Sequence, residues 1–232
     1  MTDEFAADVT GISALAEPAR RALYRYVVAQ PAPVGREQAA ADCELPMSSV
    51  KFHLDRLVDA GLLAVEFRRL TGRTGPGAGR PSKLYRRSDR QVSVSLPERR
   101  YDLAGQALAA GVESALHDGV PLPEAISEAA AALGRRFATD SGRTMTTSAQ
   151  DEPDLSRAAT VLAELGYQPQ TSETDIRLTN CPFDTLARDH TDVVCGMNVS
   201  FVGGVLQGLG CQRLEAVLDP GPQVCCVRAR RG

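Results

Sequence analysis

Five of the six cysteines of this chain lie in its last quarter, between residues 181 and 226. Four stand at nearly even intervals of 13, 15 and 13 intervening residues, and a fifth follows directly: Cys181, Cys195, Cys211, Cys225 and Cys226. Thiolates are preferred ligands of zinc, Cu(I) and the iron of iron–sulfur clusters. A single cysteine is more often a small buried apolar side chain. Five so close together favour a metal or redox role for at least three of them.

The N-terminal residues MTDEFAADVT lack the charged start and apolar core of a signal peptide, so we expect a reducing cytoplasm rather than a secreted disulfide framework. No apolar run approaches the roughly 18 residues of a membrane span. At 232 residues and 43% hydrophobic, the chain can bury one large core or two smaller ones. We therefore expect a soluble, two-domain protein with no membrane segment.

Charge is distributed unevenly along the chain. The formal net charge is −3, yet residues 51–90 hold ten basic and four acidic residues. Such a polarised sequence can present one basic face to a polyanion while the acidic remainder stays solvated. This asymmetry favours binding to nucleic acid through residues 51–90.

The N-terminal pattern predicts a winged helix-turn-helix over residues 1–92. Helices are expected at 12–30, 35–43 and 47–60, and a β-hairpin of strands 62–70 and 81–87 with a glycine-rich tip at 71–80. In this arrangement the third helix enters the major groove of double-stranded DNA and the hairpin follows the backbone. The alternative is a three-helix protein-interaction module with a solvated charge run.

On the third helix one apolar stripe faces inward, so the opposite face and its flanks are predicted to meet DNA. An exposed Phe among serines and basic residues suits the major groove, where it can contact a thymine methyl group. The expected DNA-binding residues of helix and wing are Ser48, Ser49, Lys51, Phe52, His53, Arg56, Arg73, Arg80 and Lys83.

The middle of the chain, residues 93–137, carries two helical patterns at 101–117 and 124–137, whose apolar positions suit packing against a second copy. Because inverted-repeat sites on DNA are usually bound by two-fold dimers, we expect dimerisation helices here. Residues 138–153 are small, polar and without periodicity, which predicts a linker or mobile loop.

The last segment, residues 154–232, is predicted to be a small α+β domain. It places Cys181 at a strand-to-helix junction, Cys195 near a helix start and Cys225 on the final strand. Since side chains alternate along a strand, Cys226 is expected on the opposite face from Cys225. Cys211, after a helix-ending glycine, could be a fourth ligand or a core residue.

Three motifs in the chain resemble those of the SufR-type, ArsR/DeoR-like repressors. They are S-x-x-x-x-H-L at 48–54, G-R-P-x-x-x-Y at 79–85, and N-C-P-F…H…V-C-G-M from 180 to 197. The resemblance implies a homodimer that represses genes for iron–sulfur cluster assembly and carries a [4Fe–4S] cluster. It also implies that Cys181, Cys195 and Cys225 are ligands, with Cys211 near a further family cysteine.

Two other functions compete with a cluster-dependent repressor. A structural zinc or a small-molecule-sensing domain would also use the cysteines, but four-cysteine zinc sites usually show close C-x2-4-C pairs, which this sequence lacks. A thiol–disulfide exchange enzyme is disfavoured because the chain has no C-x-x-C, no P-loop and no Ser/His/Asp grouping. The sequence therefore predicts a regulator rather than an enzyme.

Overall fold

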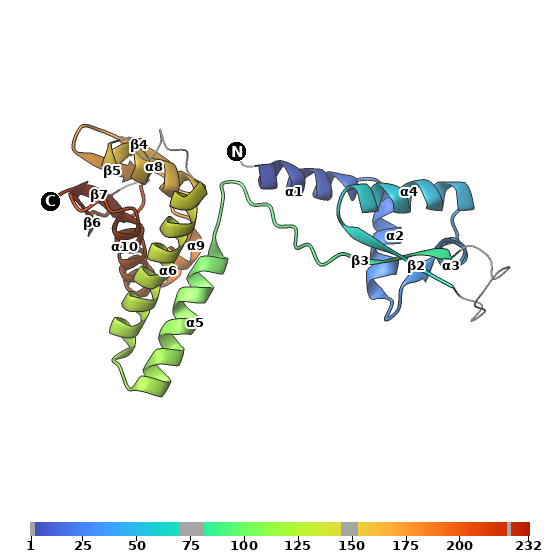
Figure 1. Ribbon diagram of the computed structural model, residues 1–232, viewed down its shortest axis with the longest axis horizontal. Helices are drawn as coiled ribbons and strands as arrows, with labels where there is room; N and C mark the ends of the chain where they lie inside the picture. Colours follow the sequence, from blue (N-terminus) through green and yellow to red (C-terminus); the bar gives the residue numbers. More distant parts are fainter. Residues whose placement is uncertain (1–2, 70–80, 145–152, 222–223) are drawn as a thin grey trace. The chain divides into compact units, whose positions relative to one another are not determined.

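The computed structural model describes residues 3–69, 81–144, 153–221 and 224–232 (Figure 1). The chain divides into two compact units, Met1–Val94 and Ser95–Gly232, each with a hydrophobic core of its own. Helices and antiparallel sheets occur in both units, and the predicted α+β class with an N-terminal winged helix-turn-helix is confirmed.

The described residues of the first unit form four helices and a three-stranded antiparallel sheet of order β1-β3-β2. Its elements are α1 Asp3–Ala14, α2 Pro18–Ala29, β1 Val34–Gly35, α3 Arg36–Asp42, α4 Met47–Asp59, β2 Leu63–Arg68 and β3 Ser82–Arg87. Strands β2 and β3 pair from Leu63 opposite Arg87 to Arg68 opposite Ser82. The expected wing tip at 71–80 lies outside the described residues.

The N-terminal helix is interrupted, so the prediction of one helix over 12–30 is wrong. The Glu17 carboxylate accepts hydrogen bonds from the backbone N–H groups of Ala19 and Arg20, and Pro18 occupies the first helical position. An acidic N-cap followed by proline favours the start of a helix. The carboxylate accepts hydrogen bonds from free N–H groups of the first turn, and proline at the first position has no N–H that would need a partner. The apolar periodicity continues across this break.

The helix α4 is held by its apolar stripe and by a glycine at its end. Val50, Leu54 and Leu57 are fully buried in the core of the first unit. Gly61 follows with a φ of +72°, and the N–H of Leu62 returns to the carbonyl of Leu57 at 3.0 Å. This left-handed cap ends the helix and directs the chain into β2.

The second unit combines five helices with a four-stranded antiparallel sheet of order β4-β5-β7-β6 among the described residues. Its elements are α5 Tyr101–Asp118, α6 Leu122–Thr144, α8 Asp154–Glu164, β4 Pro169–Thr171, β5 Asp175–Leu178, α9 Asp184–Asp189, α10 Thr191–Gly208, β6 Leu214–Leu218 and β7 Val227–Arg231. Two expectations need correction. Residues 138–144 extend α6 rather than forming a linker, and the final strand begins only at Val227, after both terminal cysteines.

Close contact between α6 and α10 organises the second unit, and the predicted dimerisation helices 93–137 therefore share a core with residues 154–232. Glycines allow the two backbones to approach. A Cβ atom on Gly204 would lie 2.1 Å from the carbonyl oxygen of Ala131, and one on Gly134 would lie 2.2 Å from that of Phe201. Neither oxygen can move away without disturbing a helix.

Gly204→Ala is expected to lower the free energy of unfolding by about 1–3 kcal/mol, because the added methyl group overpacks the interface between α6 and α10. The matched control is Gly105→Ala on α5, where nothing lies within 4 Å of the new Cβ. That control should leave stability unchanged or raise it by up to about 1 kcal/mol through helix propensity. Urea denaturation followed by circular dichroism measures both; equal stability of the two variants would contradict the close packing.

Candidate functional site

The outer face of α4 carries the side chains expected to meet DNA. Ser48, Lys51, Phe52 and Arg56 are exposed, and Phe52 remains 57% exposed despite its apolar ring. The guanidinium of Arg56 lies over that ring, 6.0 Å from its centroid. This stacking presents a flat apolar surface and a cation together, which suits a thymine methyl group beside a base edge or phosphate.

His53 lies at the flank of this face and is largely covered. Its side chain is only 12% exposed, and Nε2 lies 3.6 Å from Oε2 of Glu17, the residue that caps α2. The ring also meets Phe52 edge-on at 5.3 Å between centroids. His53 therefore ties α4 to the start of α2. The half-buried Ser49 lies at the edge of the exposed face.

The predicted wing contact Lys83 is engaged within the first unit. Its Nζ donates to Oδ1 of Asp55 at 2.5 Å, and the Tyr85 hydroxyl donates to the same oxygen at 2.9 Å. Partial burial raises the pKa of Asp55, but these hydrogen bonds outweigh it and hold that pKa below its usual value. The Lys83–Asp55 pair joins the wing to α4. Arg73 and Arg80 lie outside the described residues.

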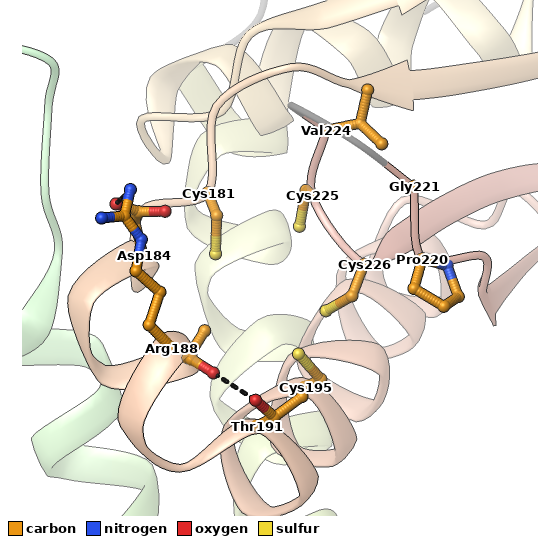
Figure 2. A pocket seen from close by; sticks show the side chains of 11 residues that line it. Cys181, Asp184, Arg188, Thr191, Cys195, Pro220, Gly221, Val224, Cys225 and Cys226 are labelled. Atoms are coloured by element: carbon orange, nitrogen blue, oxygen red, sulfur yellow. Dashed lines mark hydrogen bonds and ion pairs between the residues drawn. The ribbon is translucent and has the colours of Figure 1, made fainter.

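Four cysteines of the second unit line one pocket of about 240 Å³ (Figure 2). Cys181 follows β5, Cys195 lies in the second turn of α10, and Cys225 and Cys226 precede β7. In Figure 2 the side chains of Cys195 and Cys226 point toward each other, and Cys181 lies beside Cys225. The remaining lining residues include Asp184, Arg188, Thr191, Pro220, Gly221 and Val224.

The four thiols lie close enough to influence one another's ionisation, Cys181 with Cys225, Cys225 with Cys226, and Cys226 with Cys195. The contact with Cys225, together with burial, raises the pKa of Cys181 far above that of an ordinary thiol. The contact with Cys181 lowers the pKa of Cys225, but Cys226 and burial outweigh it and raise that pKa to about 11. Without a bound cation, the raised pKa values favour the protonated forms of Cys181 and Cys225.

Cys226, not Cys211, is the fourth cysteine of the pocket. Cys211 is 1% exposed in the core, where Nη2 of Arg157 donates to its sulfur at 3.7 Å and the sulfur contacts the carbonyl of Asp154 at 3.7 Å. The expectation that Cys226 faces away from Cys225 assumed a strand through both residues. Because β7 starts at Val227, strand alternation does not apply to them.

The loop that carries Cys181 is fastened by side chains that residue types alone did not reveal. Arg99 donates through Nη1 to Oδ1 of Asn180 at 2.5 Å and to the carbonyl of Cys181 at 3.1 Å. Asn180 in turn donates to the carbonyl of Gly166 at 2.6 Å. An asparagine just before the cysteine was the available signal, since buried amides usually anchor backbone.

Within the described ranges, no three His, Cys, Asp or Glu side chains surround a common point closely enough to hold one metal ion. The four thiols therefore line the pocket without converging on one tetrahedral site. The same part of the chain holds no helix that is long and apolar enough to cross a membrane.

Residues 15–66 match the family model of a helix-turn-helix domain. The match begins directly after α1 and runs through α4 into β2. It therefore includes the helix that carries the exposed Phe52 and Arg56. No curated protein and no solved structure matches the chain. The predicted helix-turn-helix is confirmed, and with it the prediction of a DNA-binding transcriptional regulator.

Phe52→Ala and Arg56→Ala are each expected to weaken binding to a duplex selected from a random library by about 1–3 kcal/mol and to relax its base preference. Binding to a scrambled duplex should change less, because base contacts carry specificity. Fluorescence anisotropy at fixed salt measures both. The control Arg213→Ala removes an exposed arginine of the second unit. Equal losses on both duplexes would contradict a base-reading role for Phe52 and Arg56.

Proposed function

We propose that this protein is a transcriptional repressor whose operator affinity is set by an iron–sulfur cluster held in the cysteine pocket. The observation that carries the proposal is the convergence of Cys181, Cys195, Cys225 and Cys226 from three separate segments on one pocket. Thiols that are distant in sequence and adjacent in space have little reason to be gathered for packing alone. The resemblance to SufR-type repressors supports the same reading.

The donor set fits a cluster better than a single ion. All four sulfurs are soft ligands, and they line the pocket without converging on a point where a single metal ion could be bound. In a [4Fe–4S] cluster each cysteine binds a different iron, so its ligands must surround a larger body than a zinc ion. Cys181, Cys195, Cys225 and Cys226 would hold the cluster, which supplies a centre that oxidants and iron scarcity can remove.

The chain connects this pocket to the segment that leads to the DNA-binding unit. Arg99 holds the Cys181 carbonyl, and the N–H of Arg100 donates to the carbonyl of Pro182 at 3.0 Å. Both arginines lie between the end of the first unit at Val94 and the start of α5. Movement of the Cys181 loop on loss of its ligand would therefore act directly on the connecting segment, which is how a local change reaches a distant equilibrium.

The proposal includes a homodimer on an inverted-repeat operator. The α5–α6 hairpin leaves Val112, Leu116 and Leu122 exposed, and Leu116 is 77% exposed. These apolar side chains cluster near the turn between two helices, where a second copy could bury them. Two helix-turn-helix units related by a two-fold axis would then meet two half-sites. The genes for iron–sulfur cluster assembly are the proposed targets, on the family resemblance.

Replacing any cysteine of the pocket singly by Ser is expected to remove most of the iron and sulfide bound after anaerobic reconstitution, since a hydroxyl is a poor ligand for iron. The Cys226→Ser variant is the most informative, and Cys211→Ser is its matched control, expected to load fully. Cys43→Ser, in the first unit, should also load fully. Iron and sulfide analysis with visible absorption measures the content.

A Cys226→Ser variant with full iron and sulfide would remove Cys226 from the ligand set. A colourless wild-type protein purified without oxygen and holding stoichiometric zinc would contradict the cluster and support a structural zinc site.

Arg99→Ala is expected to separate cluster status from DNA affinity. Loaded and apo wild-type protein should bind operator DNA with different affinities, and in the variant that ratio should move toward one while iron and sulfide content stays normal. The reason is that Arg99 joins the Cys181 carbonyl to the connecting segment. Arg177→Ala, an exposed arginine on β5, is the control. An unchanged ratio in Arg99→Ala would rule out this connection.

A further inference from the structure

Asn198 is an amide buried in an otherwise apolar stretch of α10. It lies one turn after Cys195, is 1% exposed, and has Val194, Phe201 and Val202 of the core around it on the same helix. Burying an amide costs free energy unless its donors and acceptor are hydrogen-bonded. Its position in the core therefore requires specific partners.

The partners of Asn198 are a phenol and a cysteine of the pocket. Its Nδ2 lies 3.3 Å from Sγ of Cys225, and its Oδ1 accepts from the hydroxyl of Tyr167 at 2.5 Å. Tyr167 is 2% exposed, and burial raises its pKa well above the usual value, so the phenol keeps its proton. Because the phenol donates to Oδ1, the amide N–H groups are directed toward the sulfur.

This orientation matches a metal-bound sulfur. A protonated thiol can donate as well as accept, so it could pair with either end of the amide. A thiolate ligand has no proton and can only accept, so only the N–H end of Asn198 suits it. Hydrogen bonds to ligating sulfurs withdraw electron density from them, and this is one of the ways in which a protein sets the potential and persistence of a cluster.

We propose that Asn198, oriented by Tyr167, is a positioning residue that hydrogen-bonds the Cys225 sulfur and thereby sets the reduction potential and retention of the bound cluster. The inference rests on the proposed function, because it concerns the sulfur that would hold the cluster. It adds two residues that are not ligands, and it predicts that they act in sequence, Tyr167 through Asn198.

Asn198→Leu tests the proposal, since leucine has a similar volume and no donor. After anaerobic reconstitution, the midpoint potential should fall relative to wild type in a redox titration followed by visible absorption and EPR. Iron release to a chelator should be about 10-fold faster, as is typical when an outer partner of a ligand is removed. Gln207→Leu makes the same exchange at an exposed site of α10 and should change neither measurement.

Tyr167→Phe removes a single hydroxyl group and provides the second test. It should shift the potential in the same direction as Asn198→Leu but by less, because the amide loses its anchor and keeps its donors. The double variant should resemble Asn198→Leu alone if the two residues act in sequence. If Asn198→Leu fails to load, Tyr167→Phe decides: a lowered potential supports the proposal and an unchanged one overturns it.

The outcomes separate this inference from the proposed function. A wild-type protein that takes up no iron and sulfide would overturn the cluster itself. A loaded wild-type protein whose potential and iron release are matched by Asn198→Leu would overturn the role of Asn198 while leaving the cluster in place.

Discussion

The antiparallel pairing of β5 with β7 is the constraint on which the cysteine pocket depends. The N–H of Cys225 donates to the carbonyl of Leu178 at 2.7 Å, and the ladder continues through Arg177 opposite Arg228 and Ile176 opposite Ala229. This pairing brings the segment before β7 beside the segment after β5. Cys181 and Cys225 therefore meet although more than 40 residues separate them. The helix α10 then completes the pocket, and its place is set by the glycine contacts that seat it against α6.

The pocket concentrates groups that are costly to bury without a partner. Burial, with the contact of Cys225 on Cys181 and of Cys226 on Cys225, raises the pKa values of Cys181 and Cys225, so the proposed cluster would have to displace their protons. Around these sulfurs, one amide is directed at Cys225 and a second, Asn180, holds the loop of Cys181. Both buried amides have hydrogen-bond partners in this arrangement of the loops, which stabilises the pocket.

The first unit follows the same logic on a smaller scale. Asp55 accepts hydrogen bonds from Lys83 and Tyr85. Glu17 accepts from the backbone N–H groups of Ala19 and Arg20 and lies beside His53. These contacts fix the orientation of α4 relative to the wing and to α2. The exposed residues of α4 include a cation that lies over an aromatic ring. A small recognition surface held by a paired charge network suits a domain that must read DNA with a rigid helix.

The sequence predicted the order of the helix-turn-helix elements and the ends of α4, because periodicity and caps are local features. It also predicted Cys181, Cys195 and Cys225 as candidate ligands, because the chemistry of a thiol belongs to the residue itself. The membership of the pocket could not be predicted. Cys226 lines the pocket beside Cys225 because β7, which pairs with β5, begins only at Val227, four residues later than expected, so strand alternation does not separate the two cysteines. The contacts of His53 with Glu17 and of Lys83 with Asp55 could not be predicted either, because these partners lie next to each other only after the helices and wing pack. Residue types determined which chemistry was available, while tertiary contacts between distant segments decided which residues meet.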